Sequence, residues 1–389
     1  MAGRNHLYIP GPTNVPDAVL NAMHVPMEDH RSPIFPNLLK PILQDLKKVF
    51  GTETGQTFIF PATGTAGWEI ALTNVLNPGD KVIIFRFGQF SHLWAEMAKR
   101  LGFDVEVHQE VWGKGIPLDR LEQRLREDTE HKIKAVLATH NETATGVTSD
   151  IAGVRKVLDS VNHPAFLFVD GVSSIASIDF RLDEWGVDAA ISGSQKGFML
   201  PAGGAILAFS QKALAAVQTS TYPRCFLDLK DQMNANKDGY TPYTPNLPLL
   251  YGLRKALDLL LEEGMDNVYA RHYRLAEGTR KAVAAWGLKL CAQPGFESNT
   301  VSAIVVPEDK DAKDVISTAF KKYNISLGAG LSEVAGKVFR IGHIGDMNDV
   351  SMLGAIAGVE MAMLDCGFNI QAGSGVAAAI EYYRSTAKA

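Results

Sequence analysis

The feature of this sequence that most constrains its fold is a regular alternation of short apolar runs with longer amphipathic segments. Helical periodicity occupies Ala66–Leu76, Ser91–Leu101 and Ile151–Val161. Seven runs around these segments have the length and composition of buried strands: Phe58–Phe60, Lys81–Phe87, Val105–Val107, Ala135–Ala138, Ala165–Val169, Ala189–Ile191 and Ala205–Phe209. This alternation predicts an α/β domain built on a mostly parallel, seven-stranded sheet.

The last third of the chain follows a different pattern. The segment Leu249–Leu288 is almost continuously helical in its periodicity, which predicts a long helix between two lobes. Two strand patterns and two helix patterns come after it, at Ser302–Val306, Lys337–Ile341, Asp311–Tyr323 and Asp349–Leu364. We therefore predict a large domain over residues 1–260 and a smaller C-terminal α+β domain over residues 261–389.

Composition and charge exclude several functional classes. The 389 residues are 46% hydrophobic and 21% charged, which is typical of a globular protein, and a net charge of −5 provides no basic field for nucleic acid. The three cysteines are odd in number and far apart, with no C-x-x-C spacing, which suggests neither a disulfide framework nor a zinc site, so we expect no metal and a reducing compartment. No run approaches the roughly 20 apolar residues that span a bilayer, and the opening residues lack the order of a signal peptide. A cytoplasmic location without membrane contact is expected.

The strongest chemical signal lies between Phe166 and Lys196. One apolar strand pattern ends in Asp170, and the next leads through a Gly-Ser-Gln turn to Lys196. In a parallel sheet both residues would lie at the carboxyl ends of strands, where open α/β sheets bind ligands. A solvated lysine and a turn-forming aspartate are the alternatives, but the apolar residues after Lys196 favour a desolvated amine that can form an imine with an aldehyde.

A lysine for the imine and a carboxylate beside a pyridine nitrogen are the two groups that pyridoxal 5'-phosphate requires. The segment Pro61–Trp68 follows a strand and opens a helix, and it offers Thr63, Gly64 and Thr65 to the cofactor phosphate. A plain helix cap is the alternative for these residues. Phe87, at the end of another strand pattern, is a candidate to cover the cofactor ring, although it can equally be a core residue.

Two further segments carry candidate site residues. Arg340 lies inside the apolar strand pattern Val338–Ile341, where a guanidinium needs a carboxylate partner. That partner is either an internal Asp or Glu or the α-carboxylate of an amino-acid substrate. Thr143, in the polar stretch His140–Gly146, is either a turn residue or a contact to the phenolic oxygen of the cofactor.

With these residues in place, the chain resembles the fold-type I, class V aminotransferases of the alanine/serine–glyoxylate group. The resemblance covers essentially the whole chain and rests on a series of blocks: PGPTNVP, FPATGTAGWEIALTN, FGQFSHLW, HNETATGVTSDI, FVDGVSSIASIDFRLDEWGVD, GSQKGFMLPAG, PYTP, LLYGLRKALDLL and GAGLSEVAGKVFRIGH. It implies a large domain that binds pyridoxal phosphate and a smaller C-terminal domain.

The resemblance also implies a role for each matching residue. Lys196 would carry the cofactor and Asp170 would pair with the pyridine nitrogen, while Arg340 would hold the substrate carboxylate. The other cofactor contacts would be phosphate contacts at Thr63, Gly64, Thr65 and Gln195, ring contacts at Phe87 and Val172, and Thr143 beside the phenolic oxygen. Relatives are homodimers, and Thr244 would reach the phosphate of the neighbouring subunit. That role suits the segment Thr221–Asn246, whose polar, Pro- and Tyr-rich sequence predicts an extended connection.

The reaction that the resemblance implies is a ping-pong transamination between small amino acids and 2-oxoacids. L-Serine would donate its amino group to glyoxylate, giving hydroxypyruvate and glycine. Aspartate or alanine as the preferred donor is the first alternative. A lyase or desulfurase on the same scaffold is a more remote one, since it needs a reactive cysteine on a mobile loop, and the surroundings of Cys225 show no such pattern.

Overall fold

A computed structural model describes residues 4–387 of the chain, and its main sheet confirms the predicted α/β architecture. Seven strands lie in the order β2-β10-β9-β8-β5-β3-β4. All run parallel except β10, which pairs antiparallel with both β2 and β9. The strands are β2 (Gln56–Phe60), β3 (Lys81–Arg86), β4 (Asp104–Gln109), β5 (Ile133–Thr139), β8 (Phe166–Asp170), β9 (Ala189–Gly193) and β10 (Ala205–Phe209).

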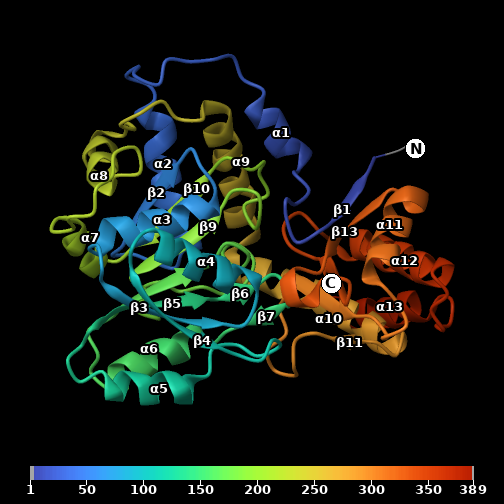
Figure 1. The fold of residues 1–389 in the computed structure, drawn as a ribbon. Coiled ribbons are helices and arrows are strands. Elements are labelled where there is room, and N and C mark those ends of the chain that lie inside the picture. The colour runs from blue at the N-terminus through green and yellow to red at the C-terminus, as the bar shows by residue number, and fades with distance from the viewer. Residues whose placement is uncertain (1–3, 388–389) are drawn as a thin grey trace.

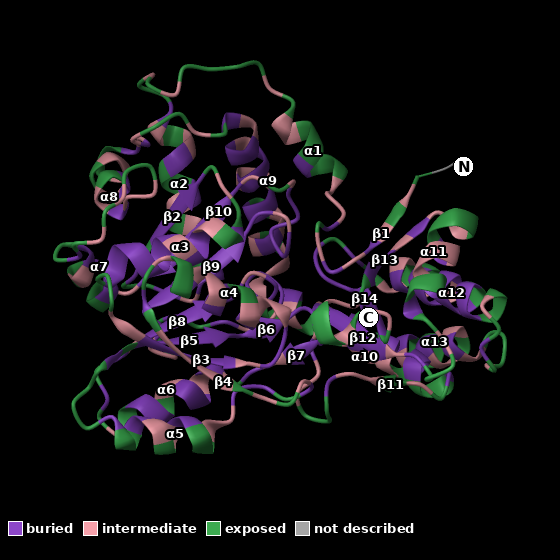
Figure 2. Ribbon diagram, viewed as in Figure 1, coloured by how far each residue is buried: buried purple, intermediate pink, exposed green. Residues whose placement is uncertain are grey.

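Helices cover both faces of this sheet, and the alternation of side chains along the strands explains why (Figures 1 and 2). In β3, Val82 and Ile84 point to one face while Ile83 and Phe85 point to the other, and all four are buried. The first face is covered by α3 (Gly64–Val75), α4 (Gln89–Arg100) and α7 (Gln211–Val217). The second is covered by α2 (Pro36–Val49), α5 (Leu118–Glu127), α6 (Ile151–Ser160) and α9 (Leu247–Glu263).

The C-terminal part folds around a second sheet, of five strands in the order β1-β13-β14-β12-β11. Its strands are β1 (His6–Tyr8), β11 (Lys289–Leu290), β12 (Val301–Val305), β13 (Ile325–Ala329) and β14 (Val338–Gly342). Its helices are α10 (Met265–Ala285), α11 (Ala312–Tyr323), α12 (Asp349–Asp365) and α13 (Ser374–Thr386), and a short 3₁₀ turn, η1 (Ser332–Val334), precedes β14. Figure 1 shows this part, in orange and red, beside the larger sheet.

Two features of this region differ from the sequence-based expectation. The continuous helix predicted over Leu249–Leu288 is broken at Gly264, whose positive φ of 82° ends α9 and turns the chain into α10. The N-terminal strand β1 lies in the C-terminal sheet, parallel to β13. The helix α1 (Asp17–Met23) that follows β1 packs against α9. The first residues of the chain therefore connect the two sheets, and the division at residue 260 stays a prediction.

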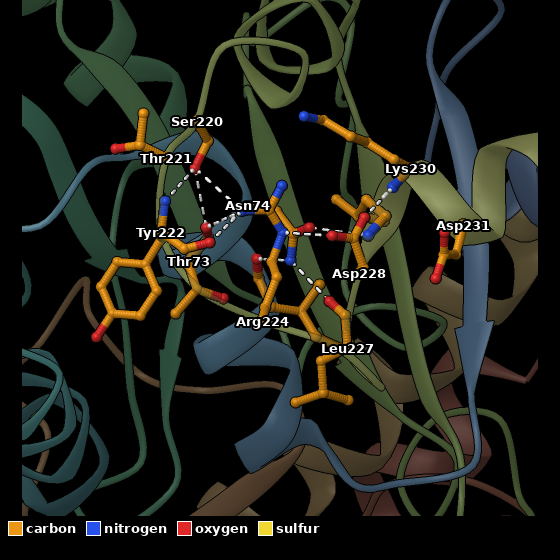
Figure 3. A network of polar contacts seen from close by, with 12 residues as sticks. Thr73, Asn74, Ser220, Thr221, Tyr222, Arg224, Leu227, Asp228, Lys230 and Asp231 are labelled. Carbon is orange, nitrogen blue, oxygen red and sulfur yellow. Dashed lines mark hydrogen bonds and ion pairs between the residues drawn. The ribbon is translucent and has the colours of Figure 1, made fainter.

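The segment Thr221–Asn246 is more structured than its composition predicts, because α8 (Leu229–Asp238) lies in its middle. Figure 3 shows how the chain before α8 is tied to the end of α3. Asn74 donates to the carbonyl of Leu227 (2.8 Å) and accepts from the amide of Leu229 (2.8 Å). Arg224 donates to the carbonyl of Thr73 (3.1 Å) and forms an ion pair with Asp228 (3.1 Å). These contacts hold the start of the segment against the large sheet.

Two remaining strands, β6 (Asn141–Glu142) and β7 (Val147–Thr148), form a small hairpin after β5. The hairpin begins beside Asp170, because Thr139 pairs with Asp170 across the sheet and the amide of His140 donates to the Asp170 carbonyl (3.0 Å). Within residues 4–387, no helix has both the length and the apolar character that crossing a membrane requires.

Candidate active site

Asp170 and Lys196 lie on the wall of one cavity of about 410 Å³ at the carboxyl ends of the parallel strands. Asp170 is the last residue of β8, and Lys196 follows the end of the neighbouring strand β9. The two strands are parallel partners, so both side chains leave the same edge of the sheet. Their convergence on one cavity is the arrangement that the sequence pattern predicts.

The surroundings of Lys196 favour an uncharged amine. The side chain is only 8% exposed, and its Nζ donates to the carbonyl of Pro10. Burial, together with the nearby positive charge of Arg340, lowers the pKa of Lys196 to about 8. At pH 8 about half of the molecules therefore hold the nucleophilic free amine.

Asp170 is buried more deeply, with 4% of its surface exposed. One carboxylate oxygen accepts a hydrogen bond from the backbone amide of Val172 (3.0 Å). Burial raises the pKa of Asp170 to about 7, and the negative charge of Glu142 acts in the same direction. A carboxylate that resists ionisation to this degree is poised to share a proton with a basic group brought into the cavity.

The start of α3 also lines the cavity, with Thr63, Gly64 and Thr65. Thr63 is the N-cap residue of the helix, and its side chain makes no capping bond. A Cβ on Gly64 would lie 2.6 Å from a methyl group of Val172, so glycine is required for the helix to approach this close. The wall therefore presents two hydroxyl groups at the positive end of a helix, where an anionic group is stabilised.

The structure does not place Phe87 on the cavity. Phe87 directly follows β3, is fully buried, and belongs to the same hydrophobic cluster as Ile83 and Phe85 of that strand. The aromatic ring on the cavity wall belongs to Phe90, in the first turn of α4, and Trp68 of α3 lies on the same wall. The role of Phe87 beside the cofactor ring therefore stays a prediction, and Phe90 is a further candidate for a ring contact.

The hairpin after β5 supplies Thr143 to the cavity wall, together with Ser173 from the turn after β8. The Thr143 hydroxyl donates to the Ser173 hydroxyl (2.8 Å), which in turn donates to the carbonyl of Asn141 (3.0 Å). The Asn141 amide donates to the hydroxyl of Thr300, just before β12 (3.0 Å). This network fixes the hairpin against both sheets. Ser173, Pro10 and Gly11 were not among the site residues predicted from the sequence, although each lies in a block that carries the resemblance.

Arg340 lies on β14 behind Thr143 and is 7% exposed. Its guanidinium donates to the backbone carbonyls of Ala329 (2.9 Å) and Thr143 (3.0 Å). Burial lowers the pKa of Arg340 to about 10, and Arg340 makes no ion pair within residues 4–387. Of the two partners considered from the sequence, no internal carboxylate forms an ion pair with Arg340 in the described part of the chain, although the negative charge of Glu142 opposes the lowering of the Arg340 pKa.

Gln195 and Thr244 are placed differently from each other. Gln195 lies on the wall beside Lys196, and its buried Oε1 has no hydrogen-bond partner. Thr244 is exposed and lines a separate hollow with Tyr243 and Phe226, not the cavity of Asp170 and Lys196. Within residues 4–387, no group of three His, Cys, Asp or Glu side chains is arranged to hold a metal ion.

Comparison with known families agrees with this geometry. The family model described as aminotransferase class V matches residues 7–345, most of the chain. This protein belongs to the class V aminotransferases. Members of this family depend on pyridoxal phosphate, and so does this enzyme.

Individual relatives of this aminotransferase are similar over almost their whole length. The serine–glyoxylate aminotransferase of Methylorubrum extorquens is 59% identical, over 98% of this chain and 96% of its own. The L-aspartate–glyoxylate aminotransferase of Paracoccus denitrificans is 55% identical, over 100% and 98%. The crystal structure of ureidoglycine–glyoxylate aminotransferase from Bacillus subtilis superposes with a TM-score of 0.91 at 26% identity, covering 99% of both chains.

The residues on the cavity fit pyridoxal phosphate. A cavity of about 410 Å³ is within the range of small-ligand sites. The start of α3, with Thr63, Gly64 and Thr65, provides backbone amides and two hydroxyl groups that can bind a phosphate. Gln195 also lines the cavity beside Lys196, and its buried Oε1 has no hydrogen-bond partner among the described residues. In this aminotransferase Lys196, Asp170, Phe90 and the start of α3 would surround the cofactor.

Proposed function

We propose that this aminotransferase moves the amino group of L-serine to glyoxylate, giving hydroxypyruvate and glycine. The observation that carries the proposal is the distribution of charge around the cavity. Lys196 is the one cation among the described residues on the wall, and Arg340 lies directly behind Thr143. One guanidinium can grip one carboxylate in a bidentate manner. Because Lys196 holds the cofactor, a donor with a second carboxylate finds no further cation among the described residues on the wall, which favours serine over aspartate.

In this proposal the residues divide the chemistry among themselves. Bound pyridoxal phosphate supplies an aldehyde that carries the amino group and a ring that withdraws electrons from the substrate Cα. The Lys196 amine removes the proton from the Cα of the amino donor. When the amino group passes to the acceptor, the same amine returns a proton to the acceptor Cα. Asp170 holds a proton at the ring nitrogen. Arg340 binds the carboxylate that serine and glyoxylate share, so that donor and acceptor occupy the same position in turn.

Replacement of Arg340 by lysine should weaken the binding of amino acids and 2-oxoacids without loss of the cofactor. A lysine keeps the charge but cannot make the two parallel N–H bonds of the guanidinium. We expect KM for serine and for glyoxylate to rise by about 30-fold or more, with a smaller fall in kcat. Steady-state kinetics and the visible absorption of the cofactor provide the two readouts. Release of the cofactor from Arg340→Lys at unchanged KM would contradict the assigned role.

The choice of donor is tested by kcat/KM for L-serine, L-alanine and L-aspartate, each measured with glyoxylate. We expect serine to exceed aspartate by about tenfold or more, because an unpaired carboxylate in a partly desolvated cavity costs more than that factor. Aspartate as the best donor would replace the proposal by its main alternative, which the 55% identical aspartate–glyoxylate relative supports. Alanine as the best donor would show that the serine hydroxyl makes no productive contact.

We further propose that two chains form a homodimer in which Thr244 reaches the cofactor phosphate of the neighbouring subunit. Two observations support this assembly: Thr244 is exposed, and it lies outside the cavity of its own protomer. Exposed apolar rings at Phe226 and Tyr243 lie next to it and would be covered by a second chain. Sedimentation equilibrium of the cofactor-bound enzyme distinguishes one chain mass from two.

A further inference from the structure

Glu142 is a fully buried carboxylate that none of the roles above uses. It lies in β6, on the hairpin that also carries Thr143, and forms no ion pair within residues 4–387. Burial raises the pKa of Glu142, while backbone N–H donors oppose that shift. The charge of Arg340 acts on Glu142 only from beyond ion-pair distance. A buried carboxylate without an ion-pair partner is costly, so its hydrogen bonds must stabilise an arrangement that the fold needs.

The partners of Glu142 are the first amides of another element, α4. Its Oε2 accepts from the amides of Phe90 (3.0 Å) and Ser91 (3.0 Å) and from the Ser91 hydroxyl (3.2 Å). The N-cap residue of α4 is Gly88, which has no side chain to cap the helix. A Cβ on Gly88 would lie 2.2 Å from the Glu142 carboxyl carbon. The glycine therefore makes room for a cap that comes from elsewhere in the chain.

The same carboxylate also holds its own hairpin. The Glu142 Oε1 accepts from the amide of Ala144 (3.1 Å), so the backbone of Thr143 is fixed between two anchored residues. The Thr143 carbonyl receives the guanidinium of Arg340 (3.0 Å). Through Phe90 on one side and Thr143 on the other, Glu142 joins two walls of the cavity.

We propose that Glu142 is a positioning residue of this enzyme, which holds Phe90 against the cofactor ring and Thr143 with Arg340 at the carboxylate end of the substrate. It acts through these residues and touches neither cofactor nor substrate itself. The inference rests on the proposed function, because it assigns Phe90 and Arg340 their parts in the reaction. Both oxygens of the Glu142 carboxylate accept hydrogen bonds from N–H groups. In a glutamine one of these oxygens is replaced by an NH₂ group, which cannot accept, so at least one N–H group loses its hydrogen bond.

The chain offers a matched control in Glu360. This residue of α12 is also buried, and it accepts from the amide of Gly375 (2.8 Å) and from the Trp286 indole (2.7 Å). It thereby caps α13, whose N-cap residue is again a glycine, Gly373, which also donates to it. Glu360 lies in the C-terminal core, away from the cavity, so Glu360→Gln removes the same kind of cap without touching the site.

The test compares Glu142→Gln and Glu360→Gln as cofactor-bound enzymes. In Glu142→Gln we expect hydrogen exchange at the Phe90 and Ser91 amides to quicken by about tenfold or more. The Kd for pyridoxal phosphate and the KM for serine should rise by a similar factor, and the visible circular dichroism of the cofactor should change. In Glu360→Gln we expect faster exchange at Gly373 and Gly375 and a lower Tm, with Kd and KM within about twofold of the unaltered enzyme.

Equal Kd and KM values in the two variants would overturn the proposal and leave Glu142 a structural cap. Unchanged exchange at Phe90 and Ser91 would overturn it as well. If Glu142→Gln does not fold, Glu142→Asp gives the same comparison, since its shorter side chain keeps the charge but cannot reach both Phe90 and Ala144. Hydrogen exchange and the Kd for the cofactor are measured without turnover. They therefore still test the positioning role of Glu142 if serine proves not to be the donor.

Discussion

Lys196→Ala should abolish transamination while leaving the fold intact. The variant loses both the amine that carries the cofactor and the base that moves the Cα proton, and no other cation among the described residues lines the cavity to replace it. We expect kcat to fall by at least about 10,000-fold, the upper range for loss of a general base. Because the side chain lies at a cavity wall, its removal leaves no new void in the core.

The stability of the cofactor-free protein provides an independent check of the same residue. Burial lowers the pKa of Lys196 to about 8 from an ordinary value of 10.5. Between these two values the unfolded chain binds more protons than the folded chain, so the contribution of this lysine to stability rises with pH across that window. Lys196→Ala should lack this rise. Turnover within tenfold of the unaltered enzyme would refute the catalytic assignment.

Asp170→Asn should lower the activity of the enzyme and raise the stability of the cofactor-free protein. An asparagine cannot hold a charged partner for the ring nitrogen, so we expect kcat to fall by about 100- to 1,000-fold, the usual loss for one preorganised electrostatic contact. The cofactor-free variant should nevertheless melt at a higher temperature above pH 7. A buried aspartate must ionise there without a cation in hydrogen-bond contact, whereas an asparagine stays neutral.

The pH dependence of this gain follows from the pKa of Asp170, which burial raises from 3.8 to about 7. Between these values the folded chain binds more protons than the unfolded one, so the contribution of Asp170 to stability falls as pH rises. The difference in Tm between Asp170→Asn and the unaltered protein should therefore widen from pH 4 to pH 7 and then level off. Calorimetry of the two cofactor-free proteins measures it.

Asp188 supplies the control for this experiment. It is equally buried and directly precedes β9, but its carboxylate accepts from the Leu167 amide (2.9 Å) and the Ser210 hydroxyl (2.8 Å) and lies 3.4 Å from the Lys212 amine. Asp188→Asn should therefore lower Tm at pH 8, the opposite sign. A loss of stability in Asp170→Asn at pH 8 would show that its carboxylate is structural.

The parts of the site that follow from local sequence were predictable. Buried strands appear in the sequence as apolar runs of about four to seven residues. Polar residues that directly follow such a run lie where the strand ends. Asp170 and Lys196 are placed by this rule alone, and so is the start of α3. The prediction of an internal or substrate partner for Arg340 required only that a guanidinium in an apolar strand cannot stay unsatisfied.

The parts that could not be predicted depend on contacts that local sequence does not show. Phe90 lies in the first turn of α4, outside the strand patterns, so the sequence did not reveal that its ring reaches the cavity. The bond from Lys196 to Pro10 joins residues 186 positions apart. In the sequence Glu142 resembles an ordinary polar turn residue, and only the fold shows that its carboxylate accepts a hydrogen bond from the start of α4.

The most direct test of the central claim is to reduce the enzyme with borohydride and to identify the modified residue by peptide mass spectrometry. Reduction fixes the cofactor covalently to the amine that holds it. We expect a single phosphopyridoxyl group, on the peptide that contains Lys196, and none in Lys196→Ala. A label on another lysine, or no label in the unaltered enzyme incubated with pyridoxal phosphate, would contradict the account of this cavity.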